Sequence, residues 1–208
     1  MTILQGQVAQ SVAPVRATGQ PNALQLQLGE LGVSAVLPRF AALAWSGLLF
    51  YGANTAAQAL SVASTTFTGL GVANPAGSGK NLVIVDVTIA QAAVGANAVM
   101  NPKLGSAATV ALTTGNSTGP TGSTMLVGSG GSSIAKVGAS ATLGAAPVMI
   151  RPILGQQWIT AGTGMWSFYA KDTVDGAIVI PPGQMLTIDA LIAAVTCIAA
   201  VTWAELPI

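Results

Sequence analysis

The sequence contains no histidine and a single cysteine, Cys197. Without an imidazole the chain lacks the commonest general base and metal ligand, and one thiol cannot form an intrachain disulfide or a thiolate metal site. Cys197 stands between Thr196 and Ile198 in an apolar run, so we expect a buried thiol and not a reactive one. The six acidic residues are scattered along the chain, so the sequence offers no evident carboxylate pair for a hydrolase. We therefore predict no enzyme activity, no catalytic or metal site and no cofactor.

Charge is also scarce, because charged residues make up 6% of the chain where about 25% is usual. The seven Lys and Arg are scattered singly and the formal net charge is +1. No basic stripe is available to neutralise phosphates, so we expect no nucleic-acid partner. Solubility usually depends on abundant surface charge, so a free monomer with so few charged residues would tend to associate. We therefore predict that much of the protein surface is buried against other protein.

Long uninterrupted apolar runs are missing as well. The most apolar early stretch, Phe40 to Tyr51, is broken by Ser46 and Gly47, whereas a membrane-spanning helix needs about 20 predominantly apolar residues. We expect a short helix or an irregular segment here, packed on the core, and no membrane insertion. The first 28 residues lack a charged region followed by an apolar one, so they do not resemble a signal peptide.

Strand patterns dominate from residue 57 onward. In the stretch Leu82 to Ala90, alternation predicts that Val83, Val85, Val87 and Ile89 share one apolar face. The preceding Gly77-Ser78-Gly79-Lys80 superficially resembles a phosphate-binding loop, but a Walker loop needs a glycine where Asn74 stands and Ser or Thr where Asn81 stands. We predict a turn at this place.

The run from Val174 to Asp189 predicts two antiparallel strands that meet at Pro181-Pro182-Gly183. Asp175-Gly176 predicts a tight reversal before the first of them. Beyond Asp189, the apolar stretch rich in Val, Ile and Thr predicts a buried central strand followed by a final edge strand.

These patterns predict an all-β fold, a β-sandwich or jelly-roll-like domain with an extended N-terminal arm and Gly/Ser/Thr-rich loops. We assign residues 1–56 to the arm and an apolar connecting segment, and 57–208 to the sandwich, with a loop-rich middle at 104–147. The arm has no periodic apolar face, so it either docks on a neighbouring subunit or is a frayed terminus.

Three further places invite a specific role. Arg151 is a lone charge among apolar residues, and it is expected to pair with Asp172, Asp175 or Glu205, or with a partner chain. The cluster of aromatic residues is expected to fill the core, with a sugar-stacking platform as the alternative; its members are Trp158, Trp166, Phe168 and Tyr169. The polar turn from Lys171 to Asp175 lacks the spacing of a calcium loop.

Three sequence features together resemble tailed-bacteriophage virion proteins of the capsid cement, decoration or head-fibre type. They are the turn from Asn74 to Asn81 before a Val-rich strand, the Asp175–Gly183 segment, and the terminal Trp203-Ala204-Glu205-Leu206-Pro207-Ile208. The resemblance covers about residues 60–90 and 148–208. It implies a sandwich or jelly-roll module, often trimeric, on the outer surface of a capsid. It transfers no functional residue, because that family has no catalytic site.

The expected function is therefore a non-enzymatic structural role in a virion. In this reading the protein is made in the host cytoplasm, binds the capsid exterior as a homo-oligomer, with a trimer favoured, and strengthens contacts between major capsid subunits. The alternative is a tail or fibre component that binds a host-surface glycan through Trp158, Trp166 and Tyr169.

Overall fold

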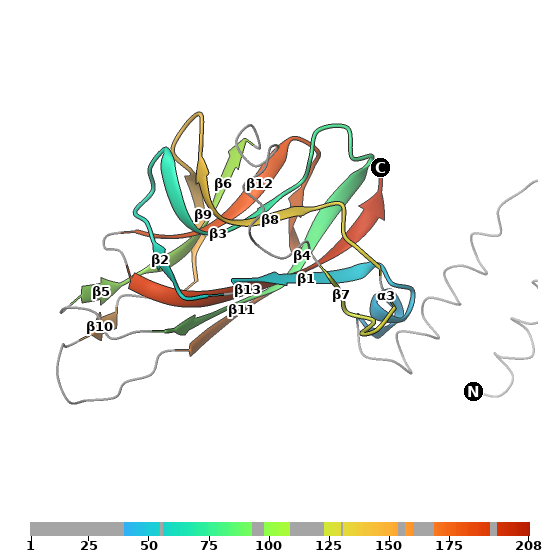
Figure 1. Ribbon diagram of the computed structural model, residues 1–208, viewed down its shortest axis with the longest axis horizontal. Helices are drawn as coiled ribbons and strands as arrows, with labels where there is room; N and C mark the ends of the chain where they lie inside the picture. Colours follow the sequence, from blue (N-terminus) through green and yellow to red (C-terminus); the bar gives the residue numbers. More distant parts are fainter. Residues whose placement is uncertain are drawn as a thin grey trace, which may run out of the picture. The chain divides into compact units, whose positions relative to one another are not determined.

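The structure, a computed structural model, is built almost wholly of antiparallel strands (Figure 1). It describes residues 40–54, 56–92, 98–108, 123–129, 131–153, 157–159, 169–191 and 195–208. The N-terminal arm at 1–39 and the Gly/Ser/Thr-rich tract at 109–122 lie outside these ranges. The chain divides into two units at Trp45/Ser46. In the first unit the described part is Phe40 and the short helix α3 (Ala41–Trp45).

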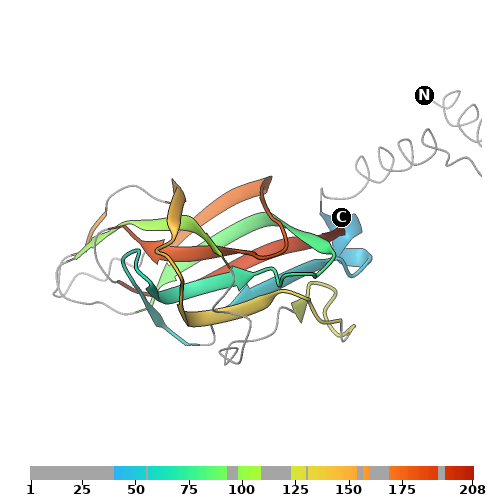
Figure 2. The same cartoon turned by 90° about the horizontal axis from the view of Figure 1, so that it is seen from above.

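The second unit is a two-layered β structure that confirms the all-β, sandwich-like prediction (Figure 2). The first sheet has the order β11 (Tyr169–Ile180), β4 (Lys80–Gln91), β13 (Val195–Pro207), β1 (Leu49–Ala53) and β7 (Ser123–Thr124), with β2 (Gln58–Leu60) also paired to β13. The second has the order β8 (Lys136–Thr142), β3 (Thr66–Ala73), β12 (Gln184–Ala190), β6 (Pro102–Ala108) and β9 (Val148–Pro152). A separate ribbon pairs β5 (Ala98–Met100) with β10 (Gln157–Ile159). Residues 49–53, assigned above to the connecting segment, thus form a strand of the first sheet.

The main hydrophobic core lies between the two sheets. Its largest fully buried side chain is Trp203 on β13, and Leu70, Leu186 and Ile188 approach from the second sheet. β12 is unusual because six consecutive residues, Met185 to Ala190, are buried on both of its faces. A smaller apolar cluster accounts for part of this; it consists of Phe67, Ala73, Ala141, Leu143 and Met185. The second sheet is therefore covered on both faces near its centre.

In β4 the predicted alternation is correct at one end of the strand and wrong at the other. Val87 and Ile89 face the core as expected, but further back the core side chains are Leu82 and Ile84, while Val83 is half-buried. The pairing with β13 matches Asp86 to Thr202 and Ile84 to Trp203, so Val85 is an extra residue. An extra residue exchanges the core-facing and outward-facing positions along the strand beyond it. The apolar pattern of the sequence does not show where such a residue lies.

The predicted reversal at Asp175-Gly176 is wrong, because both residues lie inside the single strand β11. Their φ angles are 53° and 83°, the left-handed values expected of a tight turn. The strand pairs with β4 on both sides of this point, with a register shift between Thr173 and Ile178. Two residues that are typical of a tight turn therefore form a bulge here, and β11 continues to pair with β4 beyond it.

The Pro181-Pro182-Gly183 turn forms as predicted, with Gly183 at φ 83° and the Gln184 amide donating to the Pro181 carbonyl at 3.2 Å. It joins β11 of the first sheet to β12 of the second, so the segment is not a hairpin within one sheet. The expected final edge strand is also wrong. The last strand, β13, is central, with β4 on one side and β1 on the other.

The loop at residues 74–79 is a turn, as predicted, with Gly77 and Gly79 at positive φ. The buried side chain of Asn74 stabilises this turn, because its amide donates to the carbonyls of Lys80 at 2.7 Å and Ile180 at 2.9 Å. The loop leads directly into β4 and not into a helix, so it lacks the helix N-terminus that receives phosphate in a Walker loop.

Candidate interaction surface

The strand β9 is an edge strand with three consecutive apolar side chains in solvent. Val148 is 70% exposed, Met149 49% and Ile150 43%. Successive side chains of a strand point to opposite faces, so both faces of this edge are apolar and accessible. Among the described residues β9 pairs with β6 alone. A hydrophobic edge of this kind is a place where another chain can pair or pack.

The neighbouring edge strand, β11, is held against β9 by an ion pair between the sheets. Arg151 Nε lies 3.0 Å from Asp172 Oδ2, and Arg151 Nη2 lies 2.8 Å from both carboxylate oxygens. The forked geometry of arginine suits this two-point contact. Of the partners foreseen for Arg151, the structure selects Asp172 and confirms that alternative.

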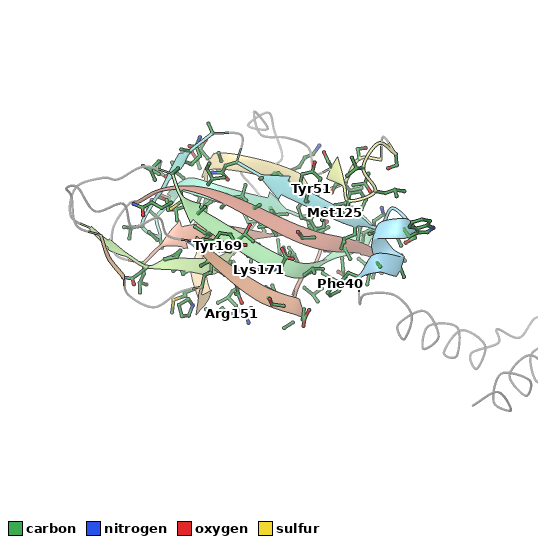
Figure 3. All side chains as sticks on the ribbon, turned by 90° about the horizontal axis from the view of Figure 1, so that it is seen from below. Phe40, Tyr51, Met125, Arg151, Tyr169 and Lys171 are labelled. Carbon is green, nitrogen blue, oxygen red and sulfur yellow. The ribbon has the colours of Figure 1, made fainter. Side chains whose placement is uncertain are left out.

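The β11 edge itself carries more polar groups than β9. Lys171 Nζ lies 3.5 Å from Asp86 Oδ2 on β4, and the bulge at Asp175 interrupts the strand. Arg151, Tyr169 and Lys171 lie on this side of the molecule (Figure 3). Charges and bulges are devices that discourage edge-to-edge pairing, which leaves β9 as the less protected of the two edges.

A second apolar patch lies at the other end of the first sheet. Tyr51 on β1 is 41% exposed, and the turn that follows β7 exposes Met125, Leu126 and Val127, the last at 91%. Met125 is anchored by its amide, which donates to the Leu49 carbonyl at 2.7 Å. The sandwich therefore presents apolar side chains at opposite ends of its strand order.

Comparisons of this chain with protein-family models, curated proteins and solved structures gave no match. Within the described residues, no group of three or more Cys, Asp or Glu side chains could hold a metal ion, and no helix is long and apolar enough to cross a membrane.

The structure places several other residues that the sequence singled out. Cys197 is buried in the main core, as predicted, and burial raises the pKa of its thiol to about 12. The expectation that the aromatic cluster fills the core is wrong for Tyr169. Tyr169 is 66% exposed at the start of β11 and Trp158 lies in β10, while Trp166 and Phe168 fall outside the described residues.

Two ion pairs that include three buried charged residues, Glu205, Lys103 and Asp189, were not foreseen. Glu205 accepts from Lys80 Nζ at 3.0 Å, from the Ile134 amide at 2.9 Å and from the Ser133 hydroxyl. Lys103 on β6 and Asp189 on β12 form a second pair with a contact of 2.7 Å. Each residue lies in an apolar or small-residue stretch, and only the pairing of strands far apart in sequence brings the partners together.

Proposed function

We infer that the sandwich is a jelly roll. The inference is supported by the nesting of its strand pairs: β1 with β13, β3 with β12, β4 with β11, β5 with β10, and β6 with β9. Such nesting means that the first half of the chain pairs antiparallel with the second half, as in one long hairpin that is then rolled into two sheets. Double-sheet jelly rolls are frequent in viral capsid and lectin domains.

We propose that the protein is a non-enzymatic structural subunit of a virion, which binds the outside of a phage capsid and cements neighbouring major capsid subunits. The observation that carries the proposal is the exposure of apolar side chains at both ends of a sandwich in a chain with 6% charged residues. Each Å² of apolar area removed from water contributes about 25 cal/mol before the costs of association. The resemblance to capsid accessory proteins points to the same role.

The two apolar ends also suggest how copies associate. We propose that the turn at Met125–Val127 of one copy covers β9 of the next, so that the same head-to-tail contact repeats around a ring. Contacts of this type close when the rotation between subunits permits it, and a trimer is the favoured closed form.

The ring contact is tested by two single variants, Val127→Lys and Ile150→Lys, each of which places a charge on one half of the contact. We expect both variants to be monomeric in sedimentation velocity. Their mixture should form dimers, since each variant retains the half that the other has lost. Ser140→Lys on the opposite edge strand, β8, is the matched control and should keep the parent assembly. Unchanged assembly in both apolar variants would refute the contact.

The cement role is tested by mixing the purified protein with undecorated capsids of the phage that encodes it. We expect the protein to cosediment with the capsids at high copy number and to raise their resistance to heat and to chelators. Absence of binding, or binding without added resistance, would contradict the proposal. A handful of copies per particle, together with glycan binding lost in Tyr169→Ala, would instead support the tail or fibre alternative, for which the exposed Tyr169 is the supporting observation.

A further inference from the structure

Lys103 and Asp189 form an ion pair that is almost completely withdrawn from water. Lys103 Nζ lies 2.7 Å from Asp189 Oδ1, and the two side chains are 3% and 0% exposed. The residues face each other across adjacent antiparallel strands, since Asp189 of β12 is in register with Lys103 of β6. Their side chains lie on the face of the second sheet opposite the main core, because the next residues along, Leu104 and Ile188, belong to that core.

The ion pair receives little support from hydrogen bonds to other described residues. Apart from their contact with each other, Lys103 Nζ and the carboxylate oxygens of Asp189 have no hydrogen-bond partner among the described residues, and the hydroxyl of Thr187 on the same face of β12 has none there either. Buried charges are normally both paired and hydrogen-bonded, because the removal of an ion from water is strongly unfavourable. The charged forms of the two groups are therefore stabilised mainly by each other.

Burial favours the neutral form of the Asp189 carboxyl. Desolvation raises the pKa of the Asp189 carboxyl, although the contact with Lys103 acts in the opposite direction. Transfer of one proton from the ammonium to the carboxylate gives an amine beside a carboxylic acid. Those are the forms in which an amine is a nucleophile and a carboxyl carbon is an electrophile.

We propose that Lys103 and Asp189 are the site of an intramolecular isopeptide bond. Lys103 Nζ attacks Asp189 Cγ, a C–N bond forms, the C–OH bond breaks, and the departing hydroxyl takes a proton from nitrogen to leave as water. The reaction requires no oxidant, no reductant and no other reactant. The fixed strand register holds the two groups in contact, which replaces a bimolecular encounter by an intramolecular one. The product ties β6 to β12 covalently at the centre of the second sheet.

The test is mass spectrometry of the purified full chain under denaturing conditions. We expect an intact mass lower than the sequence mass by one water molecule. Lys103 should resist trypsin, so that the digest contains peptide 81–136 joined to peptide 172–208. Separate peptides 81–103, 104–136 and 172–208, all of unmodified mass, would overturn the proposal. Loss of water from peptide 172–208 alone would indicate a cyclic imide and would overturn it equally.

Two variants sharpen the result. Asp189→Asn keeps the electrophilic carbon but changes the leaving group, so the linked product should be lighter than its own sequence mass by one ammonia molecule. Lys103→Arg keeps the charge and lacks a reactive amine, so its mass should equal its sequence mass. The digest of the parent chain decides the question even where a variant fails to fold.

Discussion

Glu205 is a buried carboxylate that holds a loop against the end of β13. Glu205→Ala removes the acceptor for the Ile134 amide, the Ser133 hydroxyl and the Lys80 ammonium. We expect a loss of about 3 kcal/mol in the free energy of unfolding, because buried donors are left unsatisfied. Glu205→Gln keeps a neutral acceptor and should lose about 1 kcal/mol. Urea unfolding of the three proteins measures the difference, and equal losses for both variants would contradict this role.

Cys197 provides a pH-dependent prediction. Its pKa rises from the ordinary 9.0 to about 12 on burial, so the unfolded chain releases its proton at lower pH than the folded chain. The contribution to stability is therefore fully present below pH 9 and is lost as the pH rises through the window up to about 12. A thiol reagent at pH 8 should react with Cys197 only as fast as the protein unfolds. Rapid labelling of the native protein would contradict the buried assignment.

Among the glycines that the structure describes, Gly69 on β3 leaves the least room for a side chain. Its φ is +147°, and a Cβ added there would lie 2.1 Å from the Ile188 carbonyl oxygen on β12. We expect Gly69→Ala to destabilise the fold by more than about 3 kcal/mol, because backbone and not a flexible side chain must move. Gly144→Ala is the matched control, since that position is open and needs no left-handed backbone. Thermal unfolding of both variants provides the comparison.

At the scale of elements, the ion pair between Arg151 and Asp172 joins β9 of one sheet to β11 of the other. The side chains are 37% and 18% exposed, so solvent weakens the pair, and we expect a coupling free energy of about 1 kcal/mol. The double-mutant cycle of Arg151→Met and Asp172→Asn measures it. A coupling near zero would mean that the edges are held together by packing alone.

The elements also show what could be predicted from the sequence. Alternating apolar residues and turn signals placed most strands. The isolated Arg151 was expected to pair with Asp172, Asp175, Glu205 or a partner chain, and the fold was needed to select Asp172. The bulges could not be foreseen, because Val85 and Asp175-Gly176 are extra residues only relative to their neighbours β13 and β4. The pair formed by Lys103 and Asp189 depends on register between strands more than 80 positions apart in the chain, and no local pattern encodes that register.

At the scale of the whole molecule, the central position of β13 has a consequence for synthesis. β4 and β1 are not neighbours of each other; residues 195–207 separate them and hydrogen-bond to both. Until that segment leaves the ribosome, the first sheet has an open gap with two unpaired edges. Folds that depend on contacts so distant in sequence form slowly and leave edges exposed to aggregation.

Nascent chains arrested on the ribosome test this consequence. We expect a chain that exposes residues 1–194 to be digested readily by a protease, and a chain that exposes residues 1–208 to be protected. Equal protection of the two would show that the sandwich closes without β13. The late arrival of one strand thus makes the emergence of residues 195–207 from the ribosome the step at which this protein commits to its fold.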